Sequence, residues 1–478
     1  MPRRDVARRP YQCKIVHRGQ RYEDFEQNDY LCGVKKVLII AYYWPPSGGS
    51  GVQRWLKMSK YLVRMGIDVT VYTPENPSDV PTDHSLEQEV PPEIKVIRRP
   101  ITEPYKLYRR FISGRSDSGV RTTPINSSPK SAKEKFALWV RANLFIPDPK
   151  ISWKRGSVRF LTKYLKEHPV DTLITTGPPQ SMHLIGLELA RRLPVRWVAD
   201  FRDPWTRIHY FSSLPLTGFA RRRHERLERL VLERADALVS VTDGICEDFR
   251  NQLGPERAGK VFKIYNGFDS EDFEKALQTA GPESSPENAV SRKRFVISHT
   301  GVFLSDYDPA VLWKALRELS DEDREGFGAD LLLRLAGRTD KAVTDAIAAA
   351  GLPYEDLGYL PHVEAIRLQL ASDVLLLSMH PSPEMKKVLT GKIFEYIATG
   401  RPIVSIGYKD SEIAALLKES SAGIVFGRDE LPALKSHLKA LYLDFRSGNE
   451  APSVNLERLL NSPYSRENLT RQLLNHIL

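Results

Sequence analysis

A lysine and a glutamate one helical turn apart are the residues in this sequence best suited to binding chemistry. Lys392 and Glu395 are three positions apart in a segment with helical patterning, so their side chains share one edge of the helix. A cation in a first turn, beside free backbone N–H groups and the positive end of the helix dipole, favours an anion such as a phosphate. A carboxylate on the same edge can accept hydrogen bonds from a pair of sugar or ribose hydroxyls. The alternative is a packing helix with a solvated ion pair.

The elements that must position this pair are the helix itself and the loop before it. Thr390 and Gly391 come directly before the helix and add backbone groups to the predicted anion site. Gly400 is expected to end the helix, and 401–405 to begin a strand. The sequence therefore predicts a phosphate site where a loop enters a short helix.

A strand, a glycine-rich loop and a helix follow one another near the start of the chain. The apolar run 37–41 predicts a buried strand, and Gly48, Gly49 and Gly51 lie in the loop after it. Glycines let backbone amides approach a diphosphate, and the next helix adds partial positive charge. The spacing differs from the dinucleotide-binding G-x-G-x-x-G, and no acidic residue closes the next strand, which disfavours an NAD site.

The same alternation of strands and helices continues along the chain and indicates an α/β fold with parallel sheets. A chain of 478 residues is also too long for one ordinary core, so two domains are expected. The predicted strands are 37–41, 69–72, 173–175, 196–199 and 237–241, then 295–298, 330–335, 357–359, 374–377, 403–406 and 423–426. The predicted helices include 53–65, 184–193, 434–445 and 466–478, the last with Ser465 as its N-cap.

Four segments together resemble retaining family-4 glycosyltransferases of the GT-B architecture. They are the two described above and the segments 200–205 (DFRDPW) and 265–269 (YNGFD), and the resemblance spans roughly residues 34–430. It implies two Rossmann-like domains facing a central cleft, a nucleoside diphosphate sugar held mainly by the C-terminal domain, and no metal ion or other cofactor. It also implies transfer of a sugar to a hydroxyl of a glycan or lipid-linked saccharide, with retention of the anomeric configuration.

With the resemblance, the expected organisation is as follows. A polar leader covers 1–33, an N-terminal acceptor domain 34–275 with a basic insertion over 106–160, a linker 276–292, a C-terminal donor domain 293–430, and helices returning to the N-terminal domain 431–478.

Polar residues at predicted strand ends of the N-terminal half are further candidates, because open α/β sheets bind ligands there. The resemblance implies that His183 faces the donor sugar, and a buried structural histidine is the alternative. Asp200, Arg202 and Asp203 are expected to bind the acceptor, unless Arg202 pairs internally with one of the two carboxylates.

Strand-end loops of the C-terminal half supply the remaining donor-site residues. The resemblance implies that Thr300 and Gly301 contact the diphosphate and that Gly337 and Arg338 lie beside the nucleotide. One position departs from the pattern, because the family often has a glutamate eight residues before the one that Glu395 matches, where this chain has Lys387. Glu384, slightly earlier, is a candidate substitute, and Lys387 could instead meet the diphosphate or a carboxylated sugar.

Positive charge is concentrated in one part of the chain. The formal net charge is +10, and 13 lysines and arginines against 3 acidic residues lie between Lys106 and Arg159. Within this segment, a predicted helix over 132–145 places Phe136 and Trp139 on one side. Such a helix could rest on an anionic membrane surface, or it could pack its aromatic face on the domain core. Nucleic acid is disfavoured, because aromatics and cations are not interleaved in any known motif.

The remaining sequence features concern localisation. Cys13, Cys32 and Cys246 show neither metal-ligand spacing nor an even count, so no zinc site or disulfide framework is indicated. The sequence has no apolar run typical of a signal peptide or a spanning helix. A cytoplasmic protein is expected, soluble or peripheral on the inner face of the cytoplasmic membrane.

The resulting hypothesis is a metal-independent hexosyltransferase in which His183, Lys392 and Glu395 are the catalytic residues. Lys392 and loop amides would stabilise the leaving diphosphate, and Glu395 would orient the ribose. Domain closure would exclude water. The alternatives are a nucleotide-sugar epimerase or phosphorylase of the same fold, and a non-catalytic partner subunit on the membrane.

Overall fold

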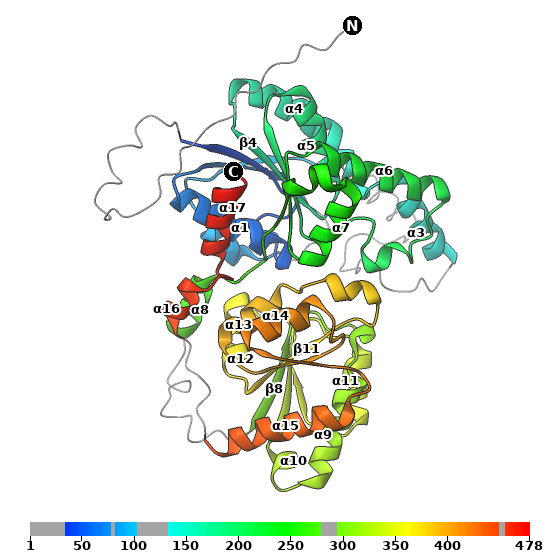
Figure 1. Cartoon of the computed structure of the whole chain (residues 1–478), viewed down its shortest axis with the longest axis vertical. Helices are drawn as coiled ribbons and strands as arrows, with labels where there is room; N and C mark the ends of the chain where they lie inside the picture. The colour runs from blue at the N-terminus through cyan, green and yellow to red at the C-terminus, as the bar shows by residue number, and fades with distance from the viewer. Residues whose placement is uncertain (1–33, 78–81, 103–131, 279–293, 449–454) are drawn as a thin grey trace, which may run out of the picture.

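Two parallel β-sheets, each covered by helices on both faces, make up the computed structural model of the chain (Figure 1). It describes residues 34–77, 82–102, 132–278, 294–448 and 455–478. The predicted leader 1–33, most of the predicted linker 276–292 and the first part of the basic insertion lie outside these residues. The α/β class with two Rossmann-like domains is confirmed.

The N-terminal sheet has seven strands in the order β3-β2-β1-β4-β5-β6-β7. Its strands are β1 (Lys36–Ile40), β2 (Asp68–Pro74), β3 (Lys95–Arg99), β4 (Thr172–Gly177), β5 (Arg196–Phe201), β6 (Ala237–Ser240) and β7 (Val261–Lys263). All neighbouring strands are parallel, with Val37 of β1 paired to Val69 of β2 and to Thr172 of β4. The strand order reverses between β1 and β4, which places a topological switch point at the strand ends beside the glycine-rich loop.

The C-terminal sheet has six strands in the order β10-β9-β8-β11-β12-β13. They are β8 (Phe295–Thr300), β9 (Leu331–Ala336), β10 (Tyr354–Asp356), β11 (Val374–Ser378), β12 (Ile403–Ile406) and β13 (Gly423–Phe426). The order again reverses beside the first strand, between β8 and β11. Both domains therefore have a topological switch point beside their first strand, the place where open α/β sheets commonly bind ligands.

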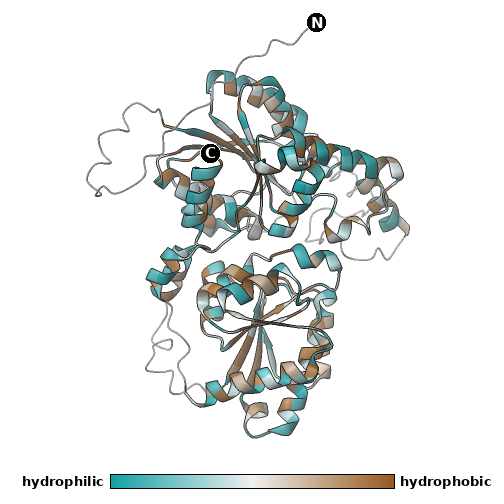
Figure 2. Cartoon of the chain, viewed as in Figure 1, coloured by the Kyte–Doolittle hydropathy of each residue, from teal (hydrophilic) through white to brown (hydrophobic). Residues whose placement is uncertain are grey.

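Helices connect successive strands and bury one apolar face against the sheets. The N-terminal helices are α1 (Ser50–Arg64), α3 (Ala132–Leu144), α4 (Trp153–Glu167), α5 (Ser181–Arg192), α6 (Gly218–Arg234), α7 (Asp243–Leu253) and α8 (Ser270–Gln278). The later helices are α9 (Ala310–Glu322), α10 (Phe327–Asp330), α11 (Lys341–Ala349), α12 (His362–Leu370), α13 (Lys392–Thr399), α14 (Glu412–Ser420), α15 (Leu431–Arg446), α16 (Leu456–Asn461) and α17 (Arg466–His476). Figure 2 shows the apolar residues on the strands and the polar residues on the outer helix faces.

The last helix leaves the C-terminal domain and packs on the N-terminal one. Whereas α15 packs against α9 of the C-terminal domain, α17 lies beside α1 (Figure 1). Leu469 and Leu473 of α17 join the core that contains Val52 and Trp55 of α1. The hydroxyl of Ser465 accepts a hydrogen bond from the amide of Asn468, as predicted for its N-cap.

The main errors of the sequence prediction lie at sheet edges. The strand expected at 357–359 is instead β10 (Tyr354–Asp356), and β3 and β7 were not predicted. All three residues of β10 are exposed, so the strand has no buried apolar residue to reveal it. β3 is mostly basic and β7 has three residues. Edge strands carry little of the apolar pattern on which such predictions depend.

No helix within the described ranges is long and apolar enough to cross a bilayer.

Candidate active site

The strand-end loops of the two domains meet at the domain boundary. Figure 1 shows α13 and α14 of the lower domain opposite α1 and α7 of the upper one. Thr242, directly after β6, donates a hydrogen bond of 2.8 Å to the carbonyl of Lys387, which follows β11. On the other side of the boundary, burial and the neighbouring Asp83 raise the pKa of Tyr359, and the amide of Asp83 donates to the carbonyl of Pro46 beside the glycine-rich loop. The predicted anion sites of both domains therefore lie at one boundary.

Lys392 opens α13 and pairs with a histidine. Its Nζ lies 3.0 Å from Nε2 of His299 at the end of β8, and Nδ1 of the same ring lies 3.1 Å from the carbonyl of Leu376. Nε2 also lies 3.4 Å from the carbonyl of Val302, but the shorter contact of Nδ1 with Leu376 favours a proton on Nδ1, so that Nε2 accepts from Lys392. Burial holds the pKa of His299 well below its usual value and lowers the pKa of Lys392 to about 7, although Glu395 acts in the opposite direction on the lysine. The lysine is thus poised to take up a proton when an anion arrives.

The start of α13 also contains an unsatisfied hydroxyl. Oγ1 of Thr390 is buried and has no hydrogen-bond partner among the described residues. Gly391, the N-cap, has open space where a Cβ would lie. Gly400 ends the helix in the left-handed conformation, φ 71°, as predicted. Thr390, Gly391 and Lys392 therefore present a hydroxyl, free helix-start amides and an amine to one small region.

Glu395 is held by partners of its own. Its Oε1 lies 3.0 Å from Nε2 of His362, and its Oε2 accepts a bond of 3.4 Å from Gln369. Burial raises the pKa of Glu395, but His362 and Arg466 outweigh it, so the pKa lies below its usual value. Nδ1 of His362 lies 3.5 Å from Asp272, and the two carboxylates raise the histidine pKa against the effect of burial. Glu395 is therefore an ionised, oriented acceptor.

Thr300 and Gly301 shape the site in a different way from the one predicted. The amide of Thr300 donates to the hydroxyl of Tyr396 at 2.9 Å, and that of Gly301 to the carbonyl of Ala336 at 2.7 Å. Both amides are used inside the protein and are not available to a diphosphate. Gly301 has φ 100°, and a Cβ there would lie 3.1 Å from Nζ of Lys392. Its contribution is conformational freedom and room for the lysine.

Gly337 has a similar role. Its amide donates to the carbonyl of Gly358 at 2.6 Å, and a Cβ would lie 2.3 Å from the carbonyl oxygen of Gly301. The loops after β8 and β9 are thus packed backbone to backbone. Arg338 is half-exposed, with Nη2 3.7 Å from Asp340, and its contact with a nucleotide stays a prediction.

On the N-terminal side, the glycine-rich loop lies against Arg202. Gly49 has φ 92° and precedes α1, while Gly48 lies directly before it, after the turn at Pro45 and Pro46. A Cβ on Gly51 would lie 2.9 Å from Nη1 of Arg202. The structure therefore places a guanidinium beside the amides predicted to approach the diphosphate. Nε of Arg202 is 3.9 Å from Asp203, and both side chains reach solvent.

Asp200 is an internal residue. Its side chain is fully buried and accepts bonds of 2.8 Å from Arg54, 2.8 Å from Trp55 and 2.9 Å from Thr176. Burial raises the pKa of Asp200, but Arg54 outweighs it and the pKa falls below its usual value. These bonds leave no free edge for an acceptor, and the internal cation is Arg54 rather than Arg202. The role of Asp200 is to hold α1 against β4 and β5.

His183 is buried as well. Its Nδ1 lies 2.9 Å from the hydroxyl of Thr175, and its ring packs on Phe201 with centroids 4.2 Å apart. Burial lowers the pKa of His183 to about 3, against a smaller effect of Asp200, so the ring is neutral. Nε2 is buried without a partner among the described residues and faces Gly177. This placement favours the structural alternative, and its contact with a donor sugar stays a prediction.

A comparison with protein families gives one match. The glycosyl transferase 4-like domain family matches residues 48–267, which include the glycine-rich loop, His183 and the 200–205 segment. The match covers a little under half of the chain and is a similarity to that family. A search of curated proteins returns no match.

Solved structures resemble both domains of the chain. A glycosyltransferase from Rickettsia africae superposes with a TM-score of 0.56 at 13% identity, covering 93% of this chain and 98% of that chain. Sucrose-phosphate synthase from Thermosynechococcus elongatus gives 0.55 at 16% identity, with 92% and 98% covered. A UDP-N-acetylglucosamine 2-epimerase gives 0.50 at 13% identity, with 93% and 96% covered. At such identities the likeness concerns the fold, which is the GT-B architecture in both domains.

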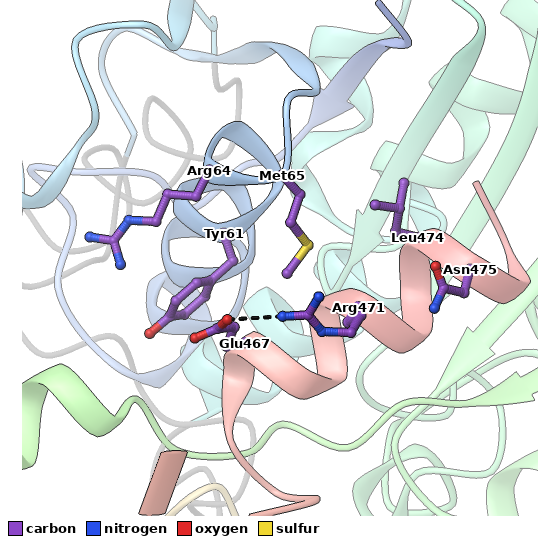
Figure 3. A pocket seen from close by; sticks show the side chains of 7 residues that line it. All are labelled: Tyr61, Arg64, Met65, Glu467, Arg471, Leu474 and Asn475. Atoms are coloured by element: carbon purple, nitrogen blue, oxygen red, sulfur yellow. Dashed lines mark hydrogen bonds and ion pairs between the residues drawn. The ribbon is translucent and has the colours of Figure 1, made fainter. Parts of the chain in front are cut away.

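Two cavities lie in the N-terminal domain and the helix α17 that packs on it. One of about 630 Å³ lies between the second half of α1 and α17, where Tyr61, Arg64 and Arg471 line it (Figure 3). It is remote from the strand-end loops and is a groove between packed helices. The other, of about 110 Å³, lies at the strand-end edge; apolar and aromatic residues line it together with Arg141, Asp148, Gln180 and His224.

Sequence reasoning missed several residues that shape this site. His299 is adjacent to the predicted Thr300, and Arg54 is a cation next to Trp55 in an amphipathic helix, a pattern that can indicate a buried ion pair. His362 and Arg466 stand at helix starts far from Glu395 in the sequence. Only the tertiary fold brings them together. Within the described ranges, no group of three or more His, Cys, Asp or Glu is placed to hold a metal ion.

Proposed function

We propose that the protein is a glycosyltransferase that transfers a sugar from a nucleoside diphosphate sugar to a hydroxyl acceptor with retention at the anomeric carbon. The observation that carries the proposal is the start of α13. There a partly buried Lys392, an unpaired Thr390 hydroxyl and helix-start amides converge at the boundary between the two domains. This combination suits a diphosphate better than any other common ligand.

In the proposed reaction, the bond between the anomeric carbon and the diphosphate oxygen breaks, and its electron pair stays on the leaving oxygen. Lys392 takes up a proton and stabilises this charge, because its pKa of about 7 in the free protein rises beside an anion. The acceptor oxygen bonds to the same face of the anomeric carbon, and its proton passes to the leaving phosphate. We expect this transfer to proceed without a metal ion, as the resemblance implies.

The other site residues would orient the substrates. Glu395, ionised and fixed by His362, would accept hydrogen bonds from the ribose hydroxyls of the donor. Arg202 and Asp203, which reach solvent beside Gly51, would bind the acceptor. The neutral His183 would contact the donor sugar through Nε2. Opposed loops of two domains would exclude water from the reacting carbon.

A ligand screen tests this proposal. Unfolding temperatures should be measured with UDP, GDP and ADP and with their hexose conjugates, with the nucleosides as controls. One diphosphate should raise the unfolding temperature, because a ligand that binds only the native state stabilises it by about 2.7 kcal/mol at a hundred times its Kd. No shift with any diphosphate at millimolar concentration would contradict the proposal.

Product analysis then separates transfer from the related chemistries. An epimerase, the activity named for one structural relative, would convert the stabilising nucleotide sugar with no acceptor present. A phosphorylase would depend on free phosphate. A transferase should release the nucleoside diphosphate in proportion to the acceptor glycosylated. A non-catalytic subunit would bind vesicles and no nucleoside diphosphate.

A membrane-bound acceptor fits one surface of the N-terminal domain. Phe136 and Trp139 of α3 are exposed and stacked, with ring centroids 6.3 Å apart, so their aromatic face does not pack on the core. Leu144 and Phe219, the latter on α6, are also exposed. The same two helices, α3 and α6, carry several lysines and arginines. We therefore propose that the enzyme rests on an anionic lipid surface, on the cytoplasmic side, with a lipid-linked saccharide as acceptor.

Vesicle flotation tests the membrane contact. The double variant F136S/W139S should bind phosphatidylserine-containing vesicles about tenfold more weakly, because two aromatic side chains no longer enter the interface. The control is Leu443→Ser, which changes an equally exposed residue of the C-terminal domain. Equal binding by the double variant and the wild type would show that Phe136 and Trp139 do not contact the membrane.

A further inference from the structure

Lys387, which departs from the family pattern, makes its contacts across the domain boundary. It ends the short turn Pro383–Lys387 and precedes Lys392 by five residues. Its Nζ lies 2.8 Å from Oδ1 of Asp248 on α7, and its carbonyl accepts a 2.8 Å bond from Oγ1 of Thr242, the N-cap of α7. Both partners belong to the N-terminal domain. Side chain and main chain of one residue thus join the two domains.

The aliphatic part of the lysine depends on a glycine. A Cβ on Gly244 would lie 2.8 Å from Cγ and 3.0 Å from Cβ of Lys387, closer than carbon atoms approach. Gly244 and Asp248 are four positions apart on α7, so they share one face of the helix. The lysine stem crosses the helix at the glycine and its ammonium reaches the carboxylate one turn later.

A carboxylate of the C-terminal domain completes the contact. The amide of Gly244 lies in the first turn of α7, where amides have no partner within the helix, and donates a 2.6 Å bond to Oε1 of Glu412. Glu412 begins α14, directly beyond the loop after β12. We use the term domain clasp for Thr242, Gly244, Asp248, Lys387 and Glu412.

We infer that Lys387 is a positioning residue which seats the donor-side loop on α7 and so sets the separation of the two domains. Asp248 also bonds Arg207 at 2.6 Å, two residues beyond the 200–205 motif. The clasp therefore connects the acceptor-side segment 200–207 to the donor-side segment 383–392. A glutamate in place of Lys387 would face Asp248 with a like charge. Asp248 therefore favours a lysine over the family's glutamate at position 387. The clasp forms whichever ligand the protein binds.

Amide hydrogen exchange on the full chain tests the clasp directly, since the protection of the Gly244 amide reports the contact between the domains. In Lys387→Met, segments 242–248 and 383–391 should exchange about two- to fivefold faster, the effect of losing a partly exposed ion pair. Lys387→Arg should restore protection. The matched control is Lys386→Met, because Lys386 pairs with Asp410 inside the C-terminal domain at 2.7 Å.

Gly244→Ala provides a second, uncharged disruption. It should raise exchange in the same two segments, because the added methyl group displaces the lysine stem, although alanine is the better helix former. With the nucleotide sugar found in the ligand screen, Lys387→Met should raise KM more than it lowers kcat. Wild-type exchange in Lys387→Met, equal loosening in Lys386→Met, or loosening spread over both domain cores would each overturn the inference. The exchange test does not depend on transferase activity. The domain clasp and the proposed function can therefore be refuted independently of each other.

Discussion

Replacement of Lys392 by alanine is expected to lower turnover of the nucleotide sugar by about 10²- to 10³-fold, the usual cost of removing one group that stabilises a developing oxyanion. Neither His299 nor Arg338 is expected to replace the amine, because His299 is neutral and Arg338 is half-exposed and lies near Asp340. Steady-state release of the nucleoside diphosphate measures the effect.

The control for this prediction is Lys386→Ala, which removes a lysine of the same domain that pairs with Asp410. Its turnover should stay within about twofold of wild type, because surface substitutions of this kind change interaction energies little. Near wild-type turnover by Lys392→Ala would remove the amine from the mechanism. Equal losses in both variants would point to general damage to the domain.

The pH dependence of binding provides an independent signature of the same amine. The free protein has a Lys392 pKa of about 7 and the bound anion raises it, so affinity for the diphosphate should be highest below pH 7. Above pH 7 affinity should fall by up to about tenfold per pH unit, since binding must then take up a proton. Glu395 and Asp272 raise the pKa of His362 against the effect of burial, so this histidine is a second group whose protonation can affect binding. In Lys392→Met the slope should therefore vanish if the lysine causes it and persist if His362 does.

Replacement of Asp200 by alanine should destabilise the N-terminal domain by about 3–5 kcal/mol, because it leaves Arg54 buried without its carboxylate. Both side chains are at most 2% exposed, and Trp55 and Thr176 lose a hydrogen-bond acceptor as well. For a domain of this size the change corresponds to a fall in unfolding temperature of about 10 °C, measurable by scanning calorimetry.

Asp203→Ala is the matched control for Asp200→Ala. Asp203 lies three positions further along the same motif but reaches solvent, so its removal should change stability by no more than about 0.5 kcal/mol. If Asp200→Ala unfolds at the wild-type temperature, the buried network does not hold α1 to the sheet. Asp200 would then regain its predicted role in acceptor binding.

The sequence predicted the architecture well because buried strands and capped helices have local signals. The strands 403–406 and 423–426 coincide with β12 and β13, and Gly400 ends α13 as expected. The apolar runs are what the two strands bury, and the glycine is what allows the helix to end, so each local signal is the cause of the element it predicts. The exposed edge strand β10 lacks such a cause, and there the prediction was wrong.

The site was less predictable because its contacts join residues distant in the sequence. Lys392 and Glu395 share a helix edge as expected, yet their partners His299 and His362 come from other elements. The acidic residues of the DFRDPW motif look alike in sequence, but only Asp200 faces Arg54 across the sheet. Which of the two carboxylates is buried depends on how α1 packs against the end of β5. No local sequence pattern determines that packing.

The most direct test of a diphosphate site between the two domains is a structure of the complex with a bound ligand. The ligand should be the nucleoside diphosphate selected by the screen. We expect the diphosphate between the loop that contains Gly49 and the start of α13, with a phosphate oxygen within hydrogen-bond distance of Nζ of Lys392. A diphosphate bound elsewhere, such as in the groove between α1 and α17, would contradict the assignment of the site.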